Sequence, residues 1–160
     1  MLLTLVLGET VQILQTPNVI TILYQRDHQV RRVYLNQPHS TNPRPIWYGE
    51  SVGHYEGANN LVVDTIGQRA ETPADKYGTP HSEKMRVVER FSLAPDRQSI
   101  HVDFMVEDPE TFTTAWSARV TYQRENGPLQ EVVCAENNRD AATGVTQEFY
   151  DIPVASRFDY

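Results

Sequence analysis

Residues 99–107 read SIHVDFMVE, and this stretch decides the fold class. Apolar side chains stand at every second position from Ile100 to Val106, and mostly polar ones stand between them. Because successive side chains of a β-strand point to opposite faces of the sheet, this pattern predicts a strand with one apolar and one polar face. His101 and Asp103 belong to the polar phase, so we expect both on the outer face.

The same alternation recurs along most of the chain, and no sustained helical period interrupts it. Strands are predicted at residues 10–15, 18–25, 28–35, 47–56, 61–66, 85–93, 99–107, 116–123 and 129–134. Without a long amphipathic helix to cover them, these strands must form a sheet that closes on itself or stacks on a second sheet. We therefore predict an all-β fold: a single antiparallel β-barrel of the lipocalin-like kind, with a jelly roll or β-sandwich as the alternative.

Length, charge and the first residues limit the function classes. A chain of 160 residues suits one domain spanning 1–160. Its 14 basic and 21 acidic residues give a net charge of −7, which phosphate backbones repel, so no nucleic-acid partner is expected. Residues 1–8 are apolar but lack a basic region and are too short to span a membrane, so we expect a soluble protein without a membrane partner. The sequence as it stands predicts a cytoplasmic protein, or a periplasmic one if the natural start lies further upstream.

Three segments lack the strand pattern. Residues 36–46 contain three prolines and are predicted to form an extended connector. Residues 67–83 are aperiodic, and loops of this length often serve as lids or binding loops. Residues 135–160 form a mostly aperiodic tail, which we expect to wrap around the barrel or around a second subunit in a homodimer.

Residues 49–53 read GESVG and match the G-x-S-x-G nucleophile elbow of serine hydrolases. That elbow requires a strand, a strained turn and then a helix, whereas a further strand pattern follows here. The two glycines therefore indicate a bulge or a close crossing of strands. The single cysteine, Cys134, ends an apolar run and is interpreted as a small buried hydrophobe.

His54, Glu56 and Asp64 form the first polar constellation. His54 and Glu56 are two residues apart on a predicted strand and therefore share one face, and Asp64 lies on the next strand. A histidine beside carboxylates can serve as a general base or offer ligands to a metal ion. An ordinary cross-strand polar cluster would give the same spacing.

Glu89 occupies the apolar phase of its strand, between Val87 and Phe91. A carboxylate facing a barrel interior would have its pKa raised by desolvation unless it is paired, which suits a general acid or base. The alternatives are a bulge that turns Glu89 outward, or a buried ion pair with an arginine such as Arg119.

His81 and four aromatic residues complete the set of candidates. His81 ends the long loop after Pro80, which would aim its ring into a cavity mouth; a free loop histidine is the alternative. His28 and His39 receive no role. The aromatic residues suit either a pocket lining or the core, and they are Trp47, Tyr48, Tyr55 and Trp116.

Several blocks of the sequence together resemble a large family of bacterial proteins without an assigned activity. The blocks are GESVGHYEG at 49–57, LVVDTIG at 61–67, PHSE at 80–83 and VVERF at 87–91. The resemblance implies no reaction. Many members of that family carry export signals, which leaves the compartment open.

Our leading hypothesis is a small acid–base enzyme, a lyase, isomerase or hydrolase that needs no cofactor. It would act on a small, partly apolar organic molecule in the barrel cavity. Glu89 or Asp64 would be the base, His54 or His81 the acid, and Tyr48 a positioning donor. The residues expected to bind the substrate are Trp47, Tyr55, Glu56 and Trp116. Replacing Glu89 by glutamine is expected to abolish turnover and leave folding intact.

Two alternatives use the same residues differently. A non-catalytic lipocalin-type protein would bind the molecule without chemistry, and its Glu89 and Asp64 would point outward or be tied in ion pairs. A metal-dependent enzyme would use His54, Glu56 and His81 as ligands.

Overall fold

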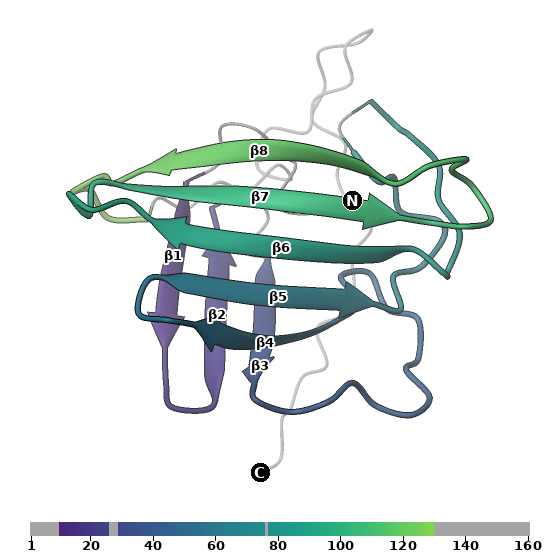
Figure 1. The fold of residues 1–160 in the computed structure, drawn as a ribbon, viewed down its shortest axis with the longest axis horizontal. Coiled ribbons are helices and arrows are strands. Elements are labelled where there is room, and N and C mark those ends of the chain that lie inside the picture. Colours follow the sequence, from purple (N-terminus) through teal and green to yellow (C-terminus); the bar gives the residue numbers. More distant parts are fainter. Residues whose placement is uncertain (1–9, 26–28, 76, 130–160) are drawn as a thin grey trace, which may run out of the picture.

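The computed structural model describes residues 10–25, 29–75 and 77–129, and these form one curled eight-stranded sheet (Figure 1). The strands are β1 (Val11–Gln15), β2 (Val19–Tyr24), β3 (Val30–Leu35), β4 (Glu50–Glu56), β5 (Asn60–Ile66), β6 (Arg86–Leu93), β7 (Ser99–Glu107) and β8 (Trp116–Gln123). The described part contains no helix, so the all-β prediction is confirmed. The strand predicted at 129–134, Cys134 and the tail at 135–160 lie outside the described residues, apart from Leu129.

The strands follow one another across the sheet in chain order. Six of the seven ladders are antiparallel, but β3 and β4 pair in parallel through only three residue pairs. A parallel pair requires a long crossover, which the proline-rich connector between Leu35 and Glu50 supplies. The predicted antiparallel pairing is thus found at six ladders, and the β3–β4 ladder is the exception.

The sheet turns sharply at the parallel joint. In Figure 1, β1–β3 run across the back of the molecule in a direction that crosses β5–β8 at the front. The strand order ends at β1 and β8, and no ladder within the described residues joins these two strands. The result is a half-barrel, with a concave face lined by alternate residues of each strand.

Two clusters of buried side chains form the core on the concave face. The first lies between β2, β3 and β5 and contains Ile20, Ile22, Tyr24, Val33, Leu35, Leu61 and Val63. The second lies under β6–β8 and contains Ala74, Met85, Val87, Phe104, Val106 and Val120. Each large apolar side chain removed from water stabilises the fold by about 1.5–3 kcal/mol.

The two glycines of the GESVG stretch permit close packing of β4. A Cβ on Gly53 would stand 2.9 Å from Val33 Cγ1, across the parallel joint. Gly49 has φ = +66°, and a Cβ there would stand 2.5 Å from the Ile66 carbonyl oxygen. Ser51 lies within β4 and is buried, so the motif forms no nucleophile elbow. Trp47 and Tyr48 form a turn before β4, where the sequence had predicted strand.

The loop at 67–83 is anchored to the rest of the fold. Ala74 belongs to the second core cluster, and its N–H donates to the Thr79 carbonyl. The Asp75 carboxylate accepts bonds from the N–H of Tyr77 and from the N–H and hydroxyl of Thr79. No helix within the described part of the chain is long and apolar enough to cross a membrane.

Candidate functional site

A buried polar cluster lies at the centre of the concave face. Arg31 of β3 and Glu89 of β6 are only 6% and 0% exposed. Arg31 Nη1 donates to Glu89 Oε1 at 3.1 Å, and Nη2 forms a second, shorter bond to Oε2. The Arg31 guanidinium also donates to Ser51 Oγ at 3.1 Å and to Thr65 Oγ1 at 2.9 Å. One ion pair and two hydroxyls therefore join four strands across the parallel joint.

Electrostatics keep Arg31 charged. Burial alone would lower the pKa of Arg31, but the charge of Glu89 and its hydrogen bonds outweigh burial and raise that pKa above its ordinary value. Tyr24 acts in the same direction. Glu89 thus lies in the interior as its phase predicts, and its partner is Arg31. The arginine that the sequence suggested, Arg119, pairs instead with Asp103 on the outer face.

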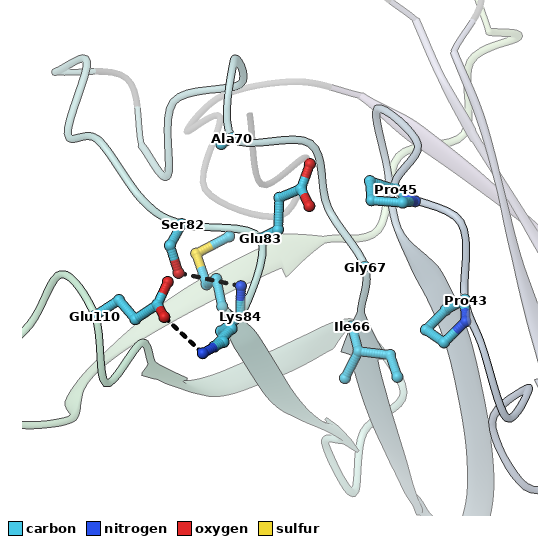
Figure 2. A pocket seen from close by; sticks show the side chains of 10 residues that line it. Pro43, Pro45, Ile66, Gly67, Ala70, Ser82, Glu83, Lys84 and Glu110 are labelled. Carbon is cyan, nitrogen blue, oxygen red and sulfur yellow. Dashed lines mark hydrogen bonds and ion pairs between the residues drawn. The ribbon is translucent and has the colours of Figure 1, made fainter.

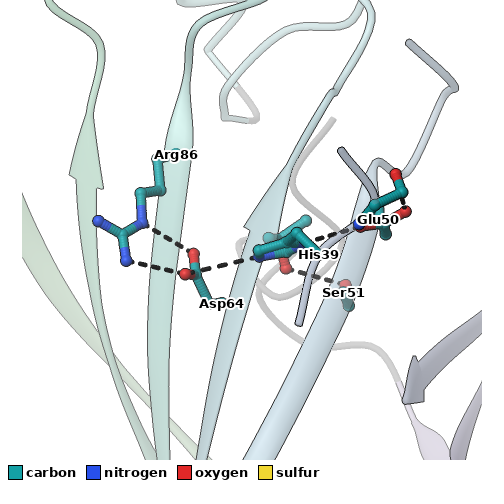
Figure 3. A network of polar contacts seen from close by, with 7 residues as sticks. His39, Glu50, Ser51, Asp64 and Arg86 are labelled. Atoms are coloured by element: carbon teal, nitrogen blue, oxygen red, sulfur yellow. Dashed lines mark hydrogen bonds and ion pairs between the residues drawn. The ribbon is translucent and has the colours of Figure 1, made fainter. Parts of the chain in front are cut away.

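A second polar network lies on the outer face of β4–β6 (Figure 3). His39, from the proline-rich connector, lies between two carboxylates, with Nδ1 2.9 Å from Glu50 Oε1 and Nε2 3.5 Å from Asp64 Oδ2. Arg86 donates to both Asp64 oxygens, at 2.9 and 2.8 Å. A bidentate pair of this kind fixes the orientation of the carboxylate. Asp64 is therefore held by Arg86 and not by the predicted His54.

Glu50 fixes the other side of His39. Its oxygens accept bonds from the Ser40 hydroxyl and the Ser40 N–H, each at 2.7 Å. The Ser40 hydroxyl is the largest influence on the pKa of Glu50, and it outweighs burial and lowers that pKa below its ordinary value, with help from His39. The connector is thus tied to β4 by an ionised carboxylate.

A cleft of about 520 Å³ opens beside this network (Figure 2). Its apolar lining comes from Pro43, Pro45, Ile66, Ala70 and Met85, and its polar lining from Ser82, Glu83, Lys84 and Glu110. Lys84 Nζ and Glu110 Oε1 form an ion pair at 2.6 Å. Asp64 and Ile66 both face outward from β5, two positions apart, so the network and the cleft are about 7 Å from each other along that strand.

The predicted histidines do not gather around Glu89. His54 is exposed near the end of β4, with Nε2 3.6 Å from Glu56 Oε1, and Glu56 also pairs with Arg90 at 2.6 Å. His81 is buried beside the loop, where Nε2 lies 2.8 Å from Thr72 Oγ1 and Nδ1 lies 2.8 Å from the Ser82 carbonyl oxygen. The described residues provide no cluster of three possible metal ligands, so His54, Glu56 and His81 do not converge on one ion.

The predicted aromatic residues are also spread over the molecule. Tyr48 packs on the first core cluster, and Trp116 packs on the second. Tyr55 is partly exposed and its hydroxyl donates to Gln15 Oε1 at 3.0 Å. Trp47 is exposed, and the Arg69 guanidinium lies 5.0 Å from its ring centre. None of the four is a lining residue of the cleft.

Sequence reasoning missed Arg31 and His39. A signal for Arg31 was present, because it occupies the same strand phase as Val33 and Leu35 and must therefore face the interior. No comparable signal existed for His39, whose position depends on the path of the connector. Comparison of the chain with protein-family models, curated proteins and solved structures finds no significant match.

Proposed function

We propose that this protein binds a small, partly apolar organic molecule without transforming it, and that the ligand occupies the cleft beside residues 67–85. The cleft carries the proposal. Its volume of about 520 Å³ falls within the range typical of small-molecule sites, about 300–1,000 Å³. Its walls combine proline, isoleucine and methionine side chains with four polar or charged residues, which suits a ligand that is only partly apolar.

The state of the predicted bases favours binding over catalysis. A general base must be within reach of the substrate and ready to take a proton. Glu89 is enclosed with Arg31, and Asp64 is held by both donors of Arg86. Each carboxylate is thus occupied by an arginine, and Glu89 is also closed off from solvent.

A steric block of the cleft tests the proposal. Ala70 is exposed at the cleft wall, so Ala70→Trp should fill the cleft without disturbing the core. Ala58→Trp is a matched control. Ala58 is an exposed alanine in the turn between β4 and β5, whereas the cleft lies at the other end of β5, beside Ile66. We expect molecules that bind the native protein in saturation-transfer NMR screening of a mixed small-molecule library to lose their signal with A70W and keep it with A58W.

Two results would contradict the proposal. Ligands that bind the native protein and A70W equally would place the site elsewhere. Conversion of a bound molecule during prolonged incubation, followed by its own NMR spectrum, would show that the protein is an enzyme.

The second candidate function is acid–base catalysis at His39 and Asp64. One observation favours it: His39 Nε2 is buried, has no hydrogen-bond partner among the described residues, and lies 3.5 Å from Asp64 Oδ2. A histidine held beside a carboxylate near a cleft is an arrangement that acid–base enzymes use. If a bound molecule is converted, His39→Gln should abolish the conversion while A58W retains it; conversion that survives His39→Gln would reject this candidate.

A further inference from the structure

Strand β1 forms one edge of the sheet, and no other strand among residues 10–25, 29–75 and 77–129 pairs with its outer side. Gln25 N–H donates to the Thr10 carbonyl and Thr16 N–H donates to the Val19 carbonyl, so the even-numbered residues of this segment bond to β2. Main-chain groups of an antiparallel strand face its two sides alternately. The N–H and C=O groups of Val11, Ile13 and Gln15 therefore point away from β2, toward the outer side of β1.

The side chains beside this edge are apolar and accessible. Ile13 is 41% exposed and Leu14 is 47% exposed, on opposite faces of the strand. One strand inward, Ile13 pairs with the buried Ile22 and Leu14 pairs with Thr21. A strand edge of this composition is a template for pairing with another strand.

Strand β1 itself lacks the charges, the proline and the bulge that often protect an edge strand. The whole stretch from Thr10 to Gln25 contains no Asp, Glu, Lys or Arg. The β1 strand itself has no proline, and its register with β2 is unbroken from Val11 to Gln15. The opposite edge differs, because β8 carries Arg119 in an exposed ion pair. Charged side chains of that kind discourage edge-to-edge pairing.

We propose that the β1 edge pairs with the β1 edge of a second copy of this chain, so that two half-barrels share one continuous sheet. An antiparallel pairing about a two-fold axis places Ile13 opposite Ile13 of the second copy. Each outward N–H and C=O of Ile13 then meets its counterpart, and those of Val11 meet those of Gln15. The strand is therefore complementary to itself, as a two-fold interface requires.

Charge also favours a second copy over a charged partner. The net charge of −7 opposes the approach of two copies in general, but residues 10–25 contribute none of it. The uncharged hairpin is thus a part of the surface where two copies can meet with little repulsion. Because five residues give a small interface, we expect a weak dimer, largely monomeric at about 1 μM and dimeric at several hundred micromolar.

The test is sedimentation equilibrium of the full chain over that concentration range, with two matched variants. Leu14→Lys places a charge at the edge. Met105→Lys is the control, because Met105 is 41% exposed but lies on β7, which is paired on both sides. We expect the native protein and M105K to dimerise with similar dissociation constants. The dissociation constant of the L14K dimer should be at least tenfold higher, with unchanged circular dichroism spectra.

A backbone variant and hydrogen exchange identify the interface. Ile13→Pro removes an N–H that points away from β2, so the hydrogen bonds of the β1–β2 ladder are kept. Edge strands accept proline at such positions. The variant should weaken the dimer as L14K does, and the Ile13 amide of the native protein should exchange more slowly at high concentration. A native protein that stays monomeric at several hundred micromolar overturns the proposal. So does a dimer that L14K leaves intact, or one that M105K disrupts equally.

Discussion

Two arginine–carboxylate pairs of similar chemistry lie on opposite faces of the sheet. Arg31 and Glu89, on the concave face, are 6% and 0% exposed. Arg119 and Asp103, on the convex face, are 65% and 42% exposed. Each pair uses two donors of the guanidinium and both carboxylate oxygens. The pairs therefore share this two-point contact and differ in their surroundings.

Their surroundings decide what each pair does for the fold. Water hydrates either member of the outer pair when the other is absent, so the outer contact contributes little. A charge in the interior has no such substitute, and loss of one member leaves the other uncompensated. The side-chain contact between β3 and β6 across the concave face therefore requires both residues of the inner pair. The Ser51 and Thr65 hydroxyls accept bonds from the same guanidinium.

Breaking the inner pair should give the largest effect. Glu89→Gln is expected to reduce the free energy of unfolding by about 3–5 kcal/mol, because Arg31 would stay charged and buried without its counter-ion. Urea-induced unfolding measures this loss. The expectation from the sequence, that this substitution would leave folding intact, is thereby revised: any loss of activity in E89Q would reflect folding as much as chemistry.

The double variant Arg31→Met, Glu89→Leu separates burial from pairing. Replacing both charges by apolar side chains of similar size is often neutral or stabilising. We expect it to be more stable than E89Q, and a double variant as unstable as E89Q would show that the ion pair itself holds the strands together.

The fold was largely predictable because its signal is local. The two-residue alternation in stretches such as residues 99–107 follows directly from the geometry of a strand, and β7 occupies that range. The parallel joint between β3 and β4 was not predictable, since alternation does not reveal which strand pairs with which. Three prolines in the connector indicated an extended path but not its direction.

The site was less predictable because it depends on that pairing. Glu89 and Arg31 each show an inward phase in the sequence, yet only the strand order makes them partners. Asp64 was assigned to His54, whereas the connector brings His39 to it and the β5–β6 ladder brings Arg86. Long-range contacts of this kind leave no trace in the spacing of residues along one strand.

Asp108 provides an intermediate case, a buried carboxylate without a close arginine among its hydrogen-bond donors. It accepts bonds from the Ser82 N–H at 2.6 Å and the Ser82 hydroxyl at 2.7 Å, which tie the end of the loop to the residue after β7. Burial is the largest influence on the pKa of Asp108 and would raise it, but the hydrogen bonds from Ser82, Thr111 and Glu110 together lower that pKa below its ordinary value.

Asp108→Asn should therefore reduce the free energy of unfolding less than E89Q does, by about 1–3 kcal/mol at neutral pH. Because the folded-state pKa is lowered, the stabilisation by the native carboxylate is present above about pH 4 and is lost as the pH falls through the folded-state value. The difference in free energy of unfolding between the native protein and D108N should thus become smaller as the pH falls. Urea unfolding at several pH values measures it, and a difference that stays constant down to pH 2.5 would contradict the assignment.

Breaking the outer pair should give the smallest effect. Arg119→Gln leaves Asp103 in contact with water, which replaces the lost hydrogen bonds, so the urea midpoint should stay within experimental error of the native value. Added salt should reduce any remaining contribution of the pair further, because dissolved ions screen exposed charges. A loss of stability in R119Q approaching that of E89Q would mean that the convex face contributes to the joint between strands, and that exposure does not separate the two pairs.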